Sequence, residues 1–156
     1  MTTTDHRTDQ ATHVDNPRRA AGARSHAARA ERRLRRVLAA NATTSIVAGA
    51  AMAIAAGSID DLLGTGHAGW VRIVGIAVVL FGVDVAWLAR RPRQDLVRFT
   101  PVVIAADAVW VVLSVATLLL GWFDGAGIAA VIAMAVAVDT YALLQFGAWR
   151  TLRTPR

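Results

Sequence analysis

The strongest constraint on the fold is a pair of apolar segments joined by a short arginine-rich turn. Segments 70–89 and 99–122 are each long enough to cross a bilayer as a helix, which needs about 20 apolar residues. The sequence RRPRQDLVR between them is too short to form a domain. Basic residues beside a span tend to keep that end in the cytoplasm. The pattern therefore predicts two antiparallel transmembrane helices with a cytoplasmic turn.

Two further segments, 37–57 and 128–149, have the same apolar character. Apolar residues make up 55% of the chain and the mean hydropathy is +0.44. Most charged residues lie outside the four segments, whereas a soluble domain would intersperse them. The sequence predicts an all-α polytopic membrane protein, with four transmembrane helices in a compact bundle.

The first of the four segments is rich in small residues. Ser45, Gly49, Ala53 and Gly57 recur at four-residue spacing. Small residues at this spacing let two helices approach closely within a membrane. We therefore expect segment 37–57 to pack against other helices over much of its surface.

The two ends of the chain differ in composition from the spans. Residues 1–29 are dominated by Thr, Asp, His, Arg and Ala without apolar periodicity, so they bury too little surface to offset the entropy of ordering. No signal-peptide core with a cleavage site is found there. We predict a disordered, Arg-rich cytoplasmic tail over 1–29, the transmembrane domain over 30–153 and a tail end at 154–156.

The distribution of basic residues predicts the orientation. All seventeen are arginine, and sixteen lie in the N-terminal region, the central turn or the C-terminal tail. Arg72 alone lies on the other side of the predicted membrane. By the positive-inside rule, both termini are expected in the cytoplasm.

Arginines next to the spans form a predicted anchor for anionic lipid headgroups, each contributing about 1 kcal/mol near the surface. The anchor residues are Arg32, Arg33, Arg35, Arg36, Arg90, Arg91 and Arg93. Nucleic-acid binding would favour aromatic residues among the basic ones and a recognisable motif, and this chain offers neither. We therefore expect the lipid bilayer, and not nucleic acid, as the partner of the basic residues.

Polar residues inside the predicted spans form the candidate site. Helix rise places Asp84, Asp107 and Asp139 about 9, 13 and 16 Å from the cytoplasmic ends of their spans. No basic residue lies at these depths, and an ionised carboxylate near the bilayer centre costs about 2.5–3.5 kcal/mol. The candidate intramembrane cluster is Asp84, Asp107, Asp139, Asn41, Gln145, Thr44 and Ser45.

This cluster has two interpretations. In the structural one, which we favour, protonated Asp residues donate to Asn41, Thr44, Ser45 or backbone carbonyls and hold the helices together, through bonds that average about 0.6 kcal/mol. In the functional one, water reaches the cluster from the cytoplasm, and the cluster binds a proton, a cation or a polar headgroup. The apolar outer half of every span argues against a continuous pore.

Motifs for catalysis are absent from the sequence. It has no Gly-rich phosphate loop, no paired His on a helix and no nucleophile elbow. The chain contains no cysteine, which excludes thiol chemistry and metal sites built on thiolates. We expect no enzymatic activity, no cofactor and no metal.

The order of these segments resembles that of a known group of proteins. The stretches RRVLAANATTSIVAGAAMAIAAGSIDDLLG, GWVRIVGIAVVLFGVDVAWLARRP and VVIAADAVWVVLSVATLLLG are similar to uncharacterised small four-span integral membrane proteins of actinobacteria and other bacteria. The resemblance covers about residues 32–150, and its most specific parts are the RRP exit and the AADxxW motif. It implies the fold and the bacterial cytoplasmic membrane, without an activity. A weaker similarity to DoxX-like four-span proteins implies a redox-associated subunit, but no motif here carries that role.

Two main classes of function follow, and an enzyme with a lipid or quinone substrate is a third, which would need a pair of ligating residues within the membrane. The first is a non-enzymatic membrane scaffold or interaction protein that binds lipid, a partner membrane protein or a second copy of itself. The alternative is a small transporter or proton-coupled protein that uses the intramembrane Asp cluster. The first predicts that Asp→Asn substitutions lower stability modestly at most, and the second predicts that at least one abolishes a pH-dependent activity.

Overall fold

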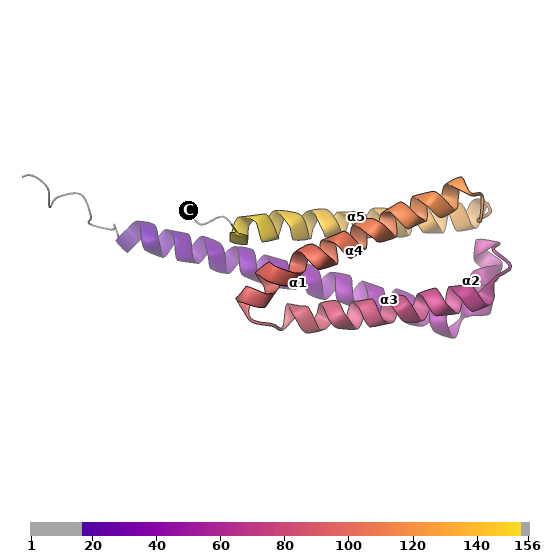
Figure 1. Ribbon diagram of the computed structural model, residues 1–156, viewed down its shortest axis with the longest axis horizontal. Coiled ribbons are helices and arrows are strands. Elements are labelled where there is room, and N and C mark those ends of the chain that lie inside the picture. Colours follow the sequence, from indigo (N-terminus) through magenta and orange to yellow (C-terminus); the bar gives the residue numbers. More distant parts are fainter. Residues whose placement is uncertain (1–16, 154–156) are drawn as a thin grey trace, which may run out of the picture.

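The computed structural model describes residues 17–153 as a set of α-helices (Figure 1). In chain order they are α1 (Pro17–Ile54), α2 (Ala56–Leu63), α3 (Ala68–Ala89), α4 (Arg93–Leu119) and α5 (Gly125–Arg153). Between residues 17 and 153 no strand occurs, so the predicted all-α class is confirmed. Helices α1, α3, α4 and α5 are each long and apolar enough to cross a membrane. These four helices indicate a multi-pass membrane protein.

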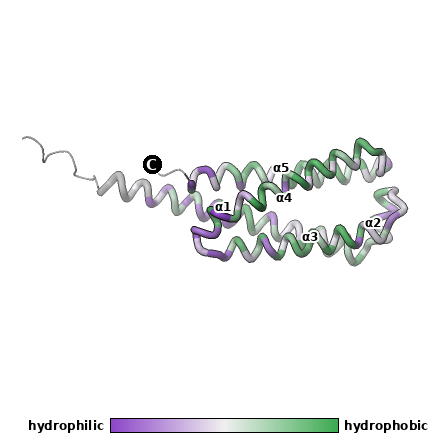
Figure 2. The backbone as a smooth tube through the Cα atoms, viewed as in Figure 1, coloured by the Kyte–Doolittle hydropathy of each residue, from purple (hydrophilic) through white to green (hydrophobic). Residues whose placement is uncertain are grey.

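The bundle has two chemically different ends. The α3–α4 turn and the end of α5 lie together at one end, beside the arginine-rich part of α1, and we name this the basic end (Figure 1). Helix α2 and the α4–α5 turn lie at the opposite end, which we name the far end (Figure 1). Purple, hydrophilic stretches gather at the basic end and recur beside α2, while α3, α4 and α5 between the two ends are largely green or pale (Figure 2).

Packing does not follow the order of the helices in the chain. Helix α1 packs along α3 and also contacts α5, and α4 packs mainly on α5. Helices α3 and α4 are joined by a short turn but contact each other little. The bundle is thus two helix pairs, α1 with α3 and α4 with α5, and the contacts between α1 and α5 connect them.

The α1–α3 pair depends on glycines that allow the two backbones to meet. A Cβ atom added at Gly49 of α1 would lie 2.6 Å from the carbonyl oxygen of Gly75 and 2.8 Å from the amide nitrogen of Val79. One added at Gly75 would lie 2.6 Å from the nitrogen of Ala53. Backbone atoms cannot yield as a flexible side chain can. The small-residue stripe of α1 therefore serves the close approach expected for it at Gly49 and Ala53.

The best-packed part of the molecule lies near the basic end. Its fully buried apolar side chains include Leu34 and Leu38 of α1, Val85 of α3 and Leu96 of α4. Towards the far end, large apolar side chains such as Leu119 remain exposed. Exposed apolar surface of this extent would be unfavourable in water but is what a lipid-facing bundle requires. The packing is therefore that of a membrane bundle with its tightest core near the basic end.

Two segments differ from the sequence-based expectation. Residues 17–29, expected to lack regular structure, form the first turns of α1; they are rich in Ala and Arg, which have high helix propensity. Residues 1–16 and 154–156 of the predicted tails lie outside the described range. The expected loop after the first span contains α2, and Gly57 therefore belongs to α2 and not to the stripe on α1. Ala55 separates the two helices.

Candidate functional site

A buried carboxylate at the centre of the bundle joins three helices. Oδ2 of Asp107 on α4 accepts hydrogen bonds from Nδ2 of Asn41 on α1, at 3.1 Å, and from Nε2 of Gln145 on α5, at 3.2 Å. The three side chains are at most 2% exposed. We name Asn41, Asp107 and Gln145 the polar triad. The triad links α4 and α5 to α1, which otherwise packs mainly with α3.

Two hydroxyl groups extend the interactions of the triad. Oγ of Ser45 donates to Oδ1 of Asn41 at 3.3 Å, one helical turn further along α1. The hydroxyls of Thr44 and Tyr141 lie 2.9 Å apart and form a second polar link between α1 and α5. Tyr141 was not among the site residues predicted from the sequence. It could have been predicted, because it is the single tyrosine of the chain and lies inside an apolar span.

The remaining two carboxylates of the predicted cluster do not join the triad. Asp84 on α3 and Asp139 on α5 are both exposed on the surface of the bundle, and neither makes a side-chain hydrogen bond to the described part of the chain. Asp84 is two residues after Gly82, which faces Ala42 and Ile46 of α1. Two residues on a helix are about 200° apart, so Asp84 lies on the opposite face of α3. Asp139 is six residues from Gln145, which on a helix with about 3.6 residues per turn places it on a different face.

The triad also contains unused hydrogen-bonding capacity. Among residues 17–153, no hydrogen-bond partner exists for the buried Oε1 of Gln145 or for the buried Oγ1 of Thr100 on α4. Thr100 is seven residues before Asp107, so the two lie on the same face of α4 about two turns apart. Thr100 was not among the site residues predicted from the sequence. Its spacing of seven residues from Asp107 could have indicated that its hydroxyl lies on the same face of the helix. The buried ring nitrogen of Trp110 also lacks a partner in the part of the chain that the structure describes.

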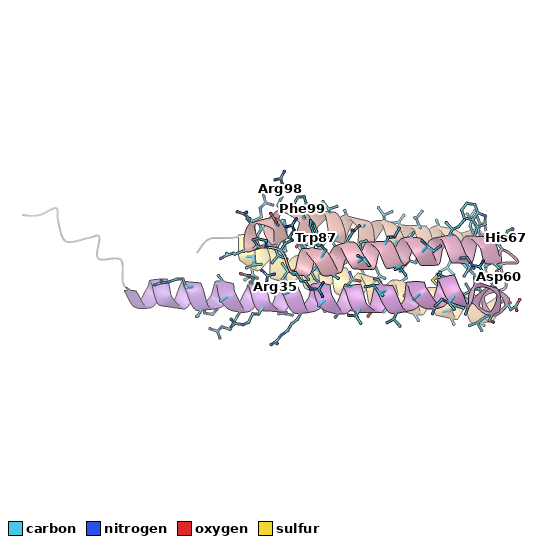
Figure 3. The ribbon with its side chains drawn as sticks, turned by 90° about the horizontal axis from the view of Figure 1, so that it is seen from below. Arg35, Asp60, His67, Trp87, Arg98 and Phe99 are labelled. Atoms are coloured by element: carbon cyan, nitrogen blue, oxygen red, sulfur yellow. The ribbon has the colours of Figure 1, made fainter. Side chains whose placement is uncertain are left out.

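A second polar arrangement lies at the far end, around Asp60 of α2 (Figure 3). Oδ1 of Asp60 accepts a hydrogen bond from the Thr65 hydroxyl and another from the backbone N–H of His67 at 2.9 Å. The Thr65 hydroxyl, followed by the His67 amide, holds the pKa of Asp60 below its ordinary value. The carboxylate thereby fixes the turn between α2 and α3, where Gly64 and Gly66 adopt positive φ.

We expect this turn to lose stability in acid. The pKa of Asp60 is lower in the folded than in the unfolded chain, so its contribution is present above the ordinary value of 3.8 and is lost as pH falls through the folded pKa. The melting temperature of the protein in detergent should exceed that of Asp60→Asn near pH 6, and the difference should shrink towards pH 3. The matched control is Asp61→Asn, at the exposed neighbouring position. A difference between wild type and Asp60→Asn that stays constant with pH would contradict the assignment.

At the basic end, several of the predicted anchor arginines bind the protein itself. Arg35 donates to Oε1 of Glu31 at 2.7 Å and to the backbone carbonyl of Ala89 at 2.7 Å, which ties α1 to the end of α3. The Arg91 guanidinium stacks 3.7 Å above the ring of Trp87, and Arg93 donates to the carbonyl of Leu152 at 3.4 Å. The other predicted anchor residues are exposed: Arg32, Arg33, Arg36 and Arg90.

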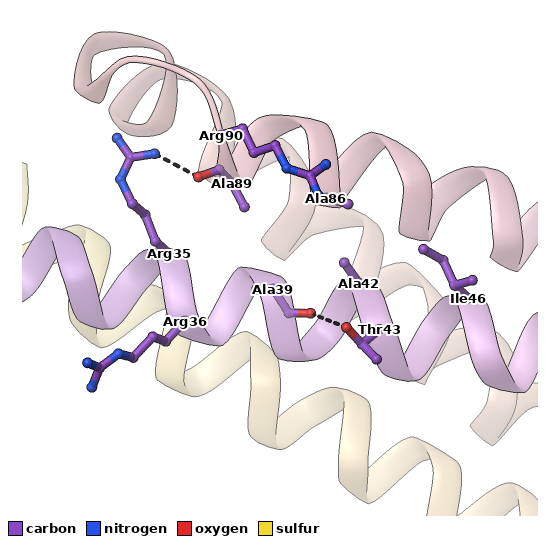
Figure 4. Close-up of a pocket in the computed structure, with 9 residues that line it drawn as sticks. All are labelled: Arg35, Arg36, Ala39, Ala42, Thr43, Ile46, Ala86, Ala89 and Arg90. Atoms are coloured by element: carbon purple, nitrogen blue, oxygen red, sulfur yellow. Dashed lines mark hydrogen bonds between the residues drawn. The ribbon is translucent and has the colours of Figure 1, made fainter.

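A groove opens between α1 and α3 next to these arginines (Figure 4). Its volume is about 430 Å³. Its lining is Arg35, Arg36, Ala39, Ala42, Thr43, Ile46, Ala86, Ala89 and Arg90. In Figure 4 the Arg90 side chain extends over Ala86, and Arg35 reaches the carbonyl of Ala89. The groove is therefore apolar along its length and cationic at its mouth.

Within the part of the chain that the structure describes, no group of three His, Cys, Asp or Glu side chains could hold a metal ion. Comparison with protein-family models, curated proteins and solved structures finds no match to this chain.

Proposed function

We propose that the protein is a non-enzymatic scaffold or interaction protein of the bacterial cytoplasmic membrane. The observation that carries the proposal is the use made of the buried polar groups. The side chains of the polar triad hydrogen-bond to one another across three helices. The other two intramembrane carboxylates, Asp84 and Asp139, lie apart from the triad on the surface of the bundle. A transport site requires polar groups that converge on a ligand, whereas this arrangement joins the two helix pairs.

In the proposed orientation, both termini and the α3–α4 turn face the cytoplasm. Sixteen of the seventeen arginines belong to the N-terminal region, the α3–α4 region and the C-terminal end, and a bias of this size sets topology. Because the chain has no cysteine, single introduced thiols report the orientation without a background signal. Ser25 and Ser58 are both exposed and lie near opposite ends of the bundle.

Labelling of these thiols in intact cells tests the orientation. A membrane-impermeant maleimide should modify Ser58→Cys in spheroplasts, and it should modify Ser25→Cys only after the cells are lysed. The two variants serve as controls for each other, since both must label fully in detergent. The opposite pattern would place the termini outside the cell and would contradict the proposed orientation.

The second candidate function is proton-coupled transport through Asp107. The observation in its favour is spare hydrogen-bonding capacity on the helices that hold the triad, because buried Oε1 of Gln145 and Oγ1 of Thr100 have no partner among the described residues. A carboxylate near such groups can exchange a proton or a cation when water enters. The two candidates differ in a measurable way, which is whether reconstituted protein moves protons.

Proton flux into proteoliposomes under an imposed pH gradient and potential distinguishes the candidates. For a scaffold, we expect wild type, Asp107→Asn and the surface control Asp139→Asn to show the flux of protein-free vesicles. Flux above that background in wild type, retained in Asp139→Asn and absent in Asp107→Asn, would support the transporter and overturn the scaffold proposal.

A further inference from the structure

We propose that the groove between α1 and α3 binds one anionic phospholipid, with the phosphate at Arg90 and an acyl chain along the apolar lining. The inference rests on the membrane location in the proposed function, but it adds a defined site and a ligand class. A general attraction of the basic end to anionic membranes would not require such a site. Three features of the groove support this assignment: its shape, its charge and its depth.

The shape of the groove follows from small side chains on facing surfaces. Ala39 and Ala42 line it from α1, and Ala86 and Ala89 line it from α3. Leucine at these positions would close the space between the helices, as larger side chains do elsewhere at this end. Its volume of about 430 Å³ falls within the roughly 300–1,000 Å³ typical of ligand sites. The space can hold a headgroup together with part of a chain.

The charge of the groove is entirely positive. Three of its lining residues are arginines, and none of the described residues that line it is acidic. Arg35 is held by Glu31 and by the carbonyl of Ala89, so it acts as a fixed part of the wall. Within the described range, the side chains of Arg36 and Arg90 have no hydrogen bond or ion pair. Guanidinium groups without a protein partner are well suited to bind phosphate.

The depth of the groove matches the structure of a lipid. Arg35 and Arg36 directly precede the apolar run of α1, and Arg90 directly follows that of α3. Ile46 is ten residues from Arg36 along α1, which places the inner end of the groove about 15 Å deeper in the membrane. A soluble phosphate compound would use the mouth and leave the apolar lining unoccupied. A phospholipid uses both, and the neighbouring bilayer supplies it.

Native mass spectrometry of the full chain in detergent tests the proposal directly. Phosphatidylglycerol and phosphatidylcholine with identical acyl chains are titrated against wild type and variants. We expect one phosphatidylglycerol to bind first, with an affinity above that for phosphatidylcholine. The substitution Arg90→Gln should lower the phosphatidylglycerol affinity by about fivefold, the effect of one arginine near a lipid surface. Phosphatidylcholine binding should change little.

Two further variants separate the site from general charge. Arg98→Gln removes an exposed arginine at the same end that does not line the groove, and it should leave the affinity unchanged. Ala39→Phe keeps every charge and fills the groove, and it should abolish the first binding event for both lipids. An equal loss in Arg98→Gln and Arg90→Gln, or unchanged binding in Ala39→Phe, would overturn the proposal. A dimer that Ala39→Phe abolishes would also overturn the proposal, because a second copy of the chain would then occupy the groove.

Failure here can be told apart from failure of the proposed function. Lipid binding in detergent depends neither on the orientation in the cell nor on proton movement. A reversed labelling pattern or a proton flux through Asp107 would therefore leave this test intact, and loss of the lipid site would leave the scaffold proposal standing.

Discussion

Replacement of Gly75 with leucine is expected to lower the free energy of unfolding by about 3 kcal/mol, the upper part of the range for overpacked interiors. The Cβ atom alone would lie 2.6 Å from the nitrogen of Ala53 and 2.7 Å from the carbonyl oxygen of Gly49. Both are backbone atoms of α1, so no rotamer change relieves the contact. The α1–α3 pair must separate, and the groove and the Arg35–Ala89 hydrogen bond should be lost with it.

The matched control lies on the same helix. Gly69 is in the first turns of α3, and a Cβ atom there meets nothing within 4 Å. Gly69→Leu should be neutral or slightly stabilising, because glycine is a poor helix former. Reversible unfolding in mixed micelles, followed by tryptophan fluorescence, measures both variants. Equal stability of Gly75→Leu and Gly69→Leu would show that α1 and α3 do not make this contact in the membrane.

Replacement of Asp107 with alanine should lower the free energy of unfolding by about 1–3 kcal/mol. The substitution removes the acceptor for Asn41 Nδ2 and Gln145 Nε2 at once. The two lost interhelical hydrogen bonds average about 0.6 kcal/mol each in a membrane, and together they give the lower figure. It applies if water takes over both freed donors. The upper figure applies if a buried donor is left without a partner, which costs about 1–3 kcal/mol in water-soluble proteins.

Three further variants identify the cause of that loss. Asp107→Asn retains an acceptor oxygen, so it should cost less than Asp107→Ala. Asp84→Ala and Asp139→Ala remove carboxylates that are exposed on the bundle and should leave stability unchanged or raise it. The same micelle titration reports all of them. If Asp139→Ala lowered the free energy of unfolding as much as Asp107→Ala does, that result would contradict the exposed position of Asp139 on the bundle.

The fold was largely predictable because the length and apolarity of a span are local properties. Segments 37–57, 70–89, 99–122 and 128–149 each lie largely within one of the long helices. Boundaries differed where the sequence continues to favour a helix beyond the apolar region, as in the Ala- and Arg-rich start of α1. Likewise, SIDDLL in the expected loop is compatible with the short helix α2.

The site was only partly predictable, because the sequence gives the depth of a residue along its span but not the face of the helix on which it lies. Counting residues from the arginines gave the depths of Asp84, Asp107 and Asp139. It could not show which face of each helix points inward, since that depends on the partner helix. The small-residue stripe around Gly49 was visible in the sequence. Its contact with Gly75 was not, because that contact depends on the packing of α1 against α3. The groove was also not predictable, because its lining comes from two helices far apart in the sequence.

The length of α1 has a mechanical consequence. Its 38 residues span about 57 Å, nearly twice the roughly 30 Å of a hydrocarbon core. The portion from residue 17 to residue 36 is therefore a rod about 30 Å long that continues directly from the membrane-crossing part. A change in helix tilt of about 10°, small against the usual 0–40° range, would swing its tip by about 5 Å. A tilt of α1 about its contacts with α3 and α5 would therefore move the start of the helix relative to the rest of the bundle.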